Sequence, residues 1–257
     1  MADITIRNQG RVTEEGKVNW RGDQVTATPG DQSIYDSSEI QLVELGARKV
    51  VGDRVFRYAK AAGAANAGKV VQSNPATIIA TAGAVQPAGA KRFTFYFATT
   101  VGADVYAEGY VISQSGTAGN MGFKYRVKGH SAVATTSDGV LVLYDPLKLA
   151  ANVTDNWSLH KNMYDGLTQN TAGTAAAPGV TPIVVADGDY FWLQTWGPAN
   201  VKCGAAVVGQ ALRAGATGQV EVIISTSAGG NIVAPIGYAL QTLTASEHGL
   251  VFLTIAP

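Results

Sequence analysis

The chain alternates apolar and polar residues with a period of two beyond about residue 41, in short runs rich in β-branched and aromatic side chains. This pattern is typical of β-strands, whose successive side chains point to opposite faces of a sheet. The clearest run, residues 92–98, places Phe93, Phe95 and Phe97 on one face. Further strands are predicted at residues 53–58, 105–112, 123–127, 139–144, 182–186, 190–195, 201–208, 218–224, 236–241 and 250–255.

Turn residues separate these runs where the chain must reverse, as in the sequences SDG at 137–139 and DGD at 187–189. Asp, Asn and Gly favour such turns because they tolerate the backbone conformations that the turns need. Evidence for helix is confined to residues 147–151 and 240–247, which are long enough for a turn or two. The sequence therefore predicts an all-β fold, an antiparallel β-sandwich or barrel of jelly-roll-like type.

The distribution of apolar residues divides the chain into an arm and a domain. Residues 1–40 carry scattered charges and few large apolar side chains, so they bury too little surface to fold alone. We interpret them as an extended N-terminal arm, followed by a β-rich domain over residues 41–257. A boundary between two sub-domains is expected near residues 146–180, where residues 171–179 form a small-residue loop.

Composition argues against several classes of partner. Charged residues make up 15% of the chain, and 19 basic residues balance 19 acidic ones. Nucleic acid is not an expected partner, because its binding depends on clustered positive charge that releases counterions. A membrane is not expected either, because no run approaches the roughly 20 apolar residues of a spanning helix and no basic cluster would attract anionic lipid. A neutral, charge-poor surface does favour self-association, because little repulsion keeps copies apart.

The N-terminus and the cysteine content indicate a protein made in the cytosol. The N-terminus lacks the basic and apolar regions of a secretory signal. The single cysteine, Cys203, can form no internal disulfide and has no second thiol with which to hold zinc.

The run GAANAGK at residues 63–69 has most of the spacing of a phosphate-binding loop. Such a loop needs Ser or Thr after the lysine to ligate magnesium, and a helix that directs its N-terminus at the phosphates. Here Val70 follows, and residues 70–75 favour a strand interrupted by proline. We therefore expect no nucleotide cofactor.

Catalytic and metal-binding patterns are equally weak. The chain has no Gly-x-Ser-x-Gly sequence, and its three histidines, His130, His160 and His248, have no ligand-like spacing. Asp187 and Asp189 flank a turn glycine and offer two carboxylates, whereas a calcium site gathers about six to eight oxygens. We expect no catalytic residue and no metal; a pocket in which His160 faces Asp155 or Asp165 would favour an enzyme.

The aromatic run at residues 190–196 indicates where the domain could contact a partner. Strict alternation places Tyr190, Trp192, Gln194 and Trp196 on one side and the intervening residues on the other. At least one side must then be core, and the other suits a subunit interface, because aromatic side chains anchor both. A platform that stacks on sugar rings is the alternative interpretation.

Several segments together resemble a known family: residues 45–48 (LGAR), 53–60 (DRVFRYAK), 106–110 (YAEGY), 143–147 (LYDPL), 188–199 (GDYFWLQTWGPA) and 236–240 (IGYAL). They are similar to tailed-bacteriophage virion proteins that decorate or cement the capsid. The resemblance covers about residues 41–257 and rests on framework glycines and aromatics; the arm does not share it. It implies a β-rich accessory subunit, commonly trimeric, that binds the major capsid protein and has no active site.

The expected function is therefore structural: a non-enzymatic capsid decoration or cement protein that stabilises the shell as a homotrimer. It would be made in the cytoplasm of a bacterial host and located on the capsid surface of the virion. The arm would act as a clamp, because an extended strand laid along a neighbour gains backbone hydrogen bonds. A receptor- or glycan-binding virion module, in a head fibre or associated with the tail, is the alternative. The expected interaction residues are Ile4, Ile6, Val18, Trp20 and Ile34 in the arm and Trp196 in the domain.

Overall fold

The fold is known from a computed structural model that describes residues 10–12, 18–20, 32–74, 77–115, 122–171, 173, 175–223 and 234–257. Over these residues every regular element is a β-strand except one 3-10 turn, Ala216–Gly218, which confirms the all-β prediction. Residues 147–151 and 240–247, where a helical turn was expected, contain bends, turns and single bridges instead. No helix in the described part of the chain is long and apolar enough to cross a membrane.

The chain forms two compact units. Unit 1 comprises residues 1–73 and 164–257, and unit 2 comprises residues 74–163. Unit 2 lies in sequence between two strands of unit 1, β6 (Val70–Gln72) and β13 (Thr168–Gln169), which pair with each other in antiparallel register. Unit 2 is therefore an insertion, with one junction inside the expected region 146–180 and a second at residues 73–74.

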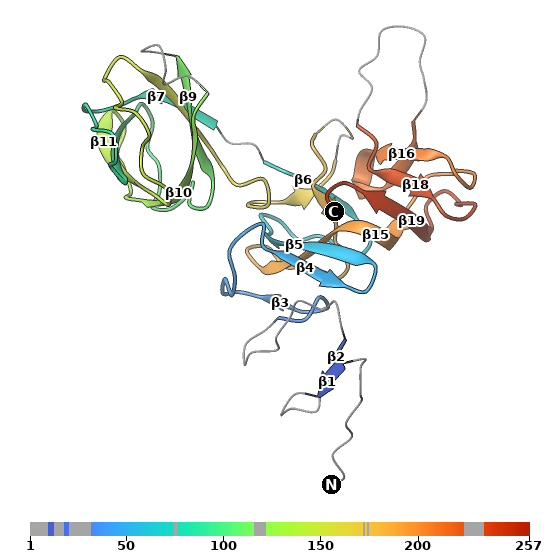
Figure 1. The fold of residues 1–257 in the computed structure, drawn as a ribbon. Coiled ribbons are helices and arrows are strands. Elements are labelled where there is room, and N and C mark those ends of the chain that lie inside the picture. Colours follow the sequence, from blue (N-terminus) through green and yellow to red (C-terminus); the bar gives the residue numbers. More distant parts are fainter. Residues whose placement is uncertain are drawn as a thin grey trace, which may run out of the picture. The chain divides into compact units, whose positions relative to one another are not determined.

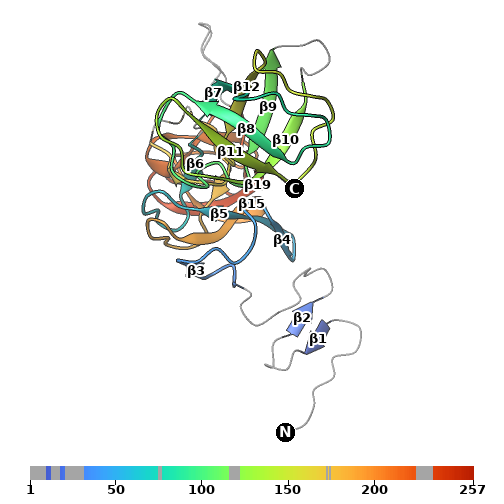
Figure 2. The same ribbon diagram turned by 90° about the vertical axis from the view of Figure 1, so that its left-hand side faces the viewer.

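Unit 2 is a curled antiparallel sheet of six strands in the order β7-β12-β9-β10-β11-β8 (Figure 1). Its strands are β7 (Thr77–Thr81), β8 (Arg92–Phe97), β9 (Tyr110–Ser115), β10 (Lys124–His130), β11 (Ser137–Leu143) and β12 (Asn156–His160). Because β8 lies beside β11 and β12 beside β9, the sheet contains two overlapping Greek keys. A bridge between Ala82 and Phe95 brings the first strand to the last and curls the sheet around its core (Figure 2).

The core of unit 2 follows from the alternation that the sequence shows. Phe93, Phe95 and Phe97 are all buried on one face of β8, as predicted. Phe93 meets Trp157 edge-on, with ring centroids 5.0 Å apart, and consecutive phenylalanines of β8 contact each other at 5.9 and 5.1 Å. Aromatic contacts of this kind add to the stabilisation that burial alone provides.

Unit 1 contains an eleven-stranded sheet, with a main path β13-β6-β14-β15-β19-β18-β16-β17 and β3, β4 and β5 attached through β15 and β5. Its remaining strands are β3 (Ser37–Ser38), β4 (Arg48–Val51), β5 (Arg54–Lys60), β14 (Gly179–Val180), β15 (Tyr190–Lys202), β16 (Ala211–Ala214), β17 (Val220–Val222), β18 (Gly237–Ala239) and β19 (His248–Thr254). Separately, β1 (Gly10–Val12) and β2 (Val18–Trp20) pair antiparallel with each other.

Strand β15 organises unit 1. It is one strand of 13 residues that contains the strand predicted at 190–195 and only the first two residues of the one predicted at 201–208. Residues 203–208 form isolated bridges and a turn instead. Its first half pairs with β5 and its second half with β19. The register shifts between Gln194 and Trp196, which marks a β-bulge at Thr195. Pro198 is tolerated because β5 no longer pairs with β15 beyond Trp196, so no ladder hydrogen bond on that side needs its missing N–H.

A local arrangement that the sequence did not reveal recurs four times. Two residues from distant segments form an isolated antiparallel bridge with two reciprocal main-chain hydrogen bonds, and a turn follows each residue. The bridges join Ala65 to Val185, Gln86 to Ala151, Val101 to Val133 and Ala206 to Leu243. In seven of the eight turns the third residue after the bridge has positive φ, namely Gly68, Gly89, Asp104, Thr136, Gly188, Gly209 and Ser246.

Two strand predictions need correction for related reasons. Residues 182–186 form no strand, because only Val185 bridges and the chain turns directly into β15. Residues 105–109 belong to a turn, so the strand predicted at 105–112 begins at Tyr110. In both places apolar residues are buried singly within turn segments, which period-two alternation cannot distinguish from a strand.

Candidate functional site

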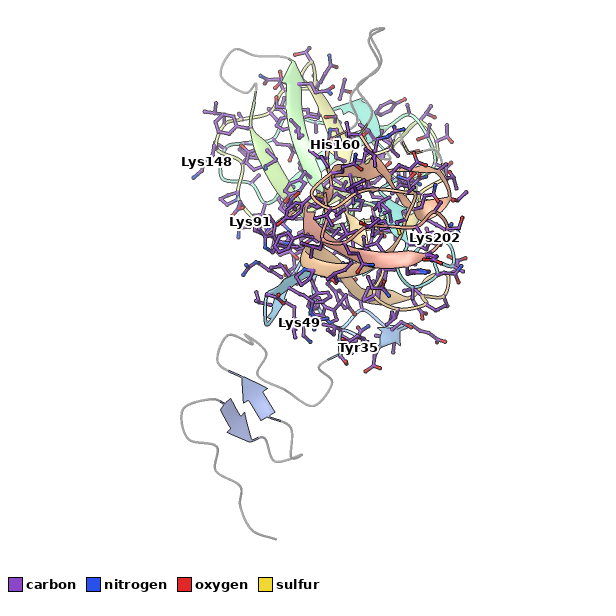
Figure 3. The ribbon with its side chains drawn as sticks, turned by 90° about the vertical axis from the view of Figure 1, so that its right-hand side faces the viewer. Tyr35, Lys49, Lys91, Lys148, His160 and Lys202 are labelled. Carbon is purple, nitrogen blue, oxygen red and sulfur yellow. The ribbon has the colours of Figure 1, made fainter. Side chains whose placement is uncertain are left out.

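Gln32 begins the described segment 32–74, and five neighbouring groups bind its buried side chain and its carbonyl. Its amide Nε2 donates to the carbonyls of Tyr190, at 2.8 Å, and Asp36, at 2.6 Å. Its Oε1 accepts from the Tyr58 hydroxyl at 2.8 Å. Its main-chain carbonyl accepts from Lys49 Nζ at 2.8 Å and from Trp192 Nε1 at 3.0 Å. We call this cluster the Gln32 anchor; Lys49 and the neighbouring Tyr35 are labelled in Figure 3.

Burial and a nearby aromatic ring support the two charged or titratable donors of the Gln32 anchor, Tyr58 and Lys49. Burial raises the pKa of the Tyr58 phenol, which keeps that hydroxyl protonated as the donor to Gln32. The Lys49 ammonium lies 5.0 Å from the centre of the Trp192 ring, a cation–π contact that offsets part of the cost of burying its charge. The anchor therefore ties the segment that begins at Gln32 to strands β4, β5 and β15.

Ile34 belongs to the core of unit 1, which corrects its assignment as an anchor for a neighbouring subunit. Its side chain is only 5% exposed and clusters with Leu45, Phe56, Tyr58 and Trp192. Strand β3 then pairs with Tyr190 and Phe191 at the start of β15. Residues 32–40, which the sequence assigned to the arm, are thus attached to the sheet through Gln32, Ile34 and β3.

Trp196 belongs to a partly exposed apolar surface on unit 1. It meets Phe252 edge-on, with centroids 5.7 Å apart, and Phe252 stacks on Tyr238 at 5.3 Å. The register of β15, β19 and β18 places Pro198, Leu250 and Leu240 on the same side. We call this surface the aromatic face; it consists of Trp196, Pro198, Tyr238, Leu240, Leu250 and Phe252.

The two sides of this part of the sheet differ in character. The side opposite the aromatic face is core, formed by residues such as Val201, Val251 and Leu253. On the aromatic face itself, Tyr238, Leu240 and Leu250 are 38%, 37% and 42% exposed. The strict alternation expected for residues 190–196 is interrupted by the bulge, because Trp192 and Gln194 are buried whereas Trp196 is half-exposed.

The other expected interaction residues lie in the arm. Ile4 and Ile6 fall outside the described residues. Val18 and Trp20 are the two ends of β2, opposite Val12 and Gly10 of β1.

Comparisons of the chain with protein-family models, with curated proteins and with solved structures found no match.

The loop at residues 63–69 leads into strand β6, as Val70 suggested, and not into a helix. Its lysine, Lys69, is buried and donates Nζ to the carbonyl of Thr217 at 2.8 Å. Burial and the neighbouring Lys202 lower the pKa of Lys69. This lysine therefore fastens the loop to the segment around the 3-10 turn.

The histidines occupy three different environments. His130 is buried between main-chain groups: its Nε2 accepts from the amide of Tyr106 at 3.1 Å, so Nδ1 carries the proton toward the Ser131 carbonyl at 2.9 Å. His160, labelled in Figure 3, has its ring nitrogens 2.8 Å from Ser158 Oγ and 3.1 Å from Thr77 Oγ1. Ser158 is fully buried, so this serine–histidine contact is closed to substrates.

The candidate metal and thiol residues also make internal contacts. The Asp189 carboxylate accepts a hydrogen bond from Ser37, and Asp187 lies exposed in the turn. No group of three His, Cys, Asp or Glu side chains that could hold a metal occurs among the described residues. Cys203 is buried with its thiol directed at the carbonyls of Glu247 and Thr244, at 3.2 and 3.6 Å, and burial raises its pKa.

A groove of about 610 Å³ in unit 1 is the feature that the sequence did not indicate. Four segments that lie far apart in the chain line it. They are the turn at residues 66–68, residues 180–182, Gln194 with residues 198–200 of β15, and His248 at the start of β19; Tyr35 and Arg54 complete the lining. Gly68 is required in this wall, because a Cβ there would lie 2.7 Å from the His248 ring and its φ is +70°.

Proposed function

We propose that this protein is a non-enzymatic structural component of a bacteriophage virion, which decorates and cements the capsid by binding the lattice of the major capsid protein. The observation that carries the proposal is the aromatic face, a surface on strands β15, β19 and β18 of which Tyr238, Leu240 and Leu250 stay more than a third exposed among the described residues. The resemblance to capsid decoration proteins is the reason for proposing the capsid as the binding partner. The aromatic face is the surface through which the protein can adhere.

We assign the aromatic face to contact between copies of this chain in a homotrimer. Its six side chains carry no charge, and the charges on neighbouring strands, Arg213 and Glu221, pair with each other at 3.4 Å. A partner must therefore be apolar and neutral where it touches this face, because an unpaired charge buried there would be costly. A second copy meets that requirement, and a chain with balanced charges has little net repulsion to overcome.

Contact with the capsid protein is assigned to the arm. An extended segment that adds main-chain hydrogen bonds to a neighbour must start from a fixed point, because a loose attachment loses more conformational entropy on binding. The Gln32 anchor is such a point, held by four hydrogen bonds to strands β4, β5 and β15. Residues 1–31 are then long enough to reach a neighbouring subunit, since an extended chain spans about 3.3 Å per residue.

Binding to shells provides the test. Shells assembled from the major capsid protein encoded in the same genome are incubated with the full chain and sedimented. A chain that lacks residues 1–31 should keep its fold and its trimeric state but no longer sediment with shells. The double variant Tyr238→Glu and Leu250→Glu should fold but sediment as a monomer in analytical ultracentrifugation, because the interface would bury its new charges.

The control is Val153→Glu, a substitution at a side chain of unit 2 that is 48% exposed and lies in a turn. It should change neither the oligomeric state nor the binding to shells. If the full chain stays monomeric at high concentration, the aromatic face does not join copies of this chain. Full decoration by the chain without residues 1–31 removes the role of the arm.

A further inference from the structure

The groove of unit 1 carries polar side chains that lack protein partners. Gln194 is 5% exposed, and its Nε2 donates to the carbonyls of Trp196, at 3.1 Å, and Pro198, at 2.8 Å. Both amide hydrogens are thereby used, whereas Oε1 accepts no hydrogen bond from the described residues. This oxygen is not among the buried side-chain atoms without a partner, so it is open to the groove that Gln194 lines and can accept a hydrogen bond from a bound molecule.

Three further polar side chains in the groove wall are exposed to solvent. The side-chain amides of Asn66 and Asn200 and the ring of His248 make no hydrogen bond to another described residue. The main chain around them is fixed, because Thr181 Oγ1 donates to the Asn66 carbonyl and the Lys202 amide donates to the Gly68 carbonyl. The groove thus presents preorganised groups that both donate and accept.

The charged side chains in the groove lining limit which classes of ligand can bind there. Arg54 is the one permanently charged side chain in the lining, and no carboxylate is present among the residues that form it. Its guanidinium lies 5.6 Å from the centre of the Phe56 ring and donates to the Tyr35 hydroxyl at 3.3 Å. The remaining N–H groups of a positioned guanidinium suit a carboxylate, which accepts two of them in parallel.

The rim of the groove offers a stacking surface. Tyr35 is 61% exposed, and its hydroxyl is tied to Arg54. A ring held in this way can lie against the apolar face of a sugar while its neighbours bind the hydroxyl groups. The size of the groove, about 610 Å³, accommodates a ligand of two or three sugar units, because small-molecule sites span about 300–1,000 Å³.

We propose that this groove binds an acidic saccharide, with the carboxylate on Arg54, the hydroxyl groups on Asn66, Asn200 and Gln194 Oε1, and one ring against Tyr35. Amides suit hydroxyl groups because both partners donate and accept. One cation among neutral amides matches a sugar with a single carboxylate, whereas a phosphate carries more charge than the groove compensates. The proposal concerns unit 1 alone and does not depend on the capsid role.

The test measures binding of the full chain to two acidic probes, trigalacturonic acid and 3′-sialyllactose, and two neutral ones, maltotriose and lactose, by saturation-transfer NMR and calorimetry. At least one acidic probe should bind, with neutral probes at least about tenfold weaker, which corresponds to about 1.4 kcal/mol. Arg54→Gln should remove that preference. Asn200→Asp, at an exposed position, should weaken the binding of acidic probes relative to the native chain, because it places a carboxylate in the groove.

The matched control is Arg92→Gln, an exposed arginine at the start of β8 in unit 2, which should bind as the native chain does. Thermal unfolding of each variant checks the fold. If Arg54→Gln is unfolded, the binding of acidic probes to Asn200→Asp tests the proposal in its place. The proposal is overturned if neither acidic probe binds at millimolar concentration, or if neutral probes bind equally well. It is also overturned if Arg92→Gln loses as much binding as Arg54→Gln, or if inorganic phosphate displaces the saccharide at equal concentration.

Discussion

Tyr58 donates its hydroxyl hydrogen to the side-chain oxygen of Gln32 at 2.8 Å, which ties strand β5 to the segment that begins at Gln32. The same hydroxyl accepts from the amide of Leu42 at 3.2 Å. One phenol therefore holds two segments that precede the first long strand. This contact explains why residues 32–42 are part of the folded unit although they are poor in strong strand formers.

Replacing Gln32 with alanine should destabilise unit 1. The substitution leaves the Tyr58 hydroxyl and the Tyr190 carbonyl without their partner, and each such buried group costs about 1–3 kcal/mol. Urea unfolding followed by hydrogen-exchange mass spectrometry should show lower stability in peptides of β5 and β15 and unchanged stability in unit 2. Gln86→Ala, which removes an exposed hydrogen bond in unit 2, should shift neither. Equal losses for both variants would contradict the anchor.

Ile34 and Ile40 should respond differently to the same substitution. Ile34→Ala empties a site in the core and should cost about 2–5 kcal/mol of unfolding free energy. Ile40 is 71% exposed, so Ile40→Ala should change stability by less than about 0.5 kcal/mol. Equilibrium denaturation measures both. If Ile34 anchored a neighbouring subunit, as its place in the expected arm suggested, its replacement would leave the stability of the isolated chain unchanged.

The sequence predicted the fold class because period-two alternation is local information. The phenylalanines of β8 and the core of β19 follow directly from it. The insertion of unit 2 was not visible, because the pairing of Thr168 with Gln72 joins residues that are distant in the chain. Likewise, β15 looked like two strands because Gly197 and Pro198 read as a break, whereas a bulge keeps the strand continuous.

The recurring turns and the groove escaped the sequence for physical reasons of the same kind. Glycine occupies the positive-φ position in four of these turns, but Asp104, Thr136 and Ser246 occupy it in the others, so no fixed residue pattern repeats. The groove gathers single residues from several segments, and only the pairing of β14, β15 and β19 brings them together. Trp196 is the interaction residue expected in the domain; it is half-exposed, and its role in an interface stays a prediction.

Alkaline pH should destabilise unit 2 through Tyr106. Burial raises the pKa of this phenol above its ordinary value of 10.0, so the folded state binds its proton more tightly than the unfolded state does. The resulting stability is fully present below pH 10 and is lost as the pH rises through the raised value. Tyr106→Phe should remove this part of the loss between neutral pH and pH 11, measured by urea unfolding. Tyr96→Phe, at a side chain 37% exposed, should follow the native profile.

Cys203 should resist alkylation in the folded chain. The thiolate is the reactive form, and burial together with the charge of Glu247 raises the pKa of the thiol. Iodoacetamide at pH 8 should therefore label the native protein far more slowly than the urea-unfolded protein, as intact mass spectrometry would show. Rapid labelling without denaturant would mean that the segment over Cys203 opens readily and would contradict the burial of the thiol in the core.

Gly197 should be irreplaceable at the centre of β15, whereas Gly52 should not. Both have positive φ, +85° and +62°, so an alanine at either position is strained by the backbone alone. A Cβ at Gly197 would also lie 2.3 Å from the carbonyl oxygen of Asp53, a main-chain atom that cannot move without shifting β5. Around Gly52 nothing lies within 4 Å. Gly52→Ala should thus cost about 1 kcal/mol, and Gly197→Ala several times more, in equilibrium unfolding. Similar costs for the two variants would show that β5 and β15 can separate at the bulge without loss, so that the long strand does not hold the two halves of unit 1 in register.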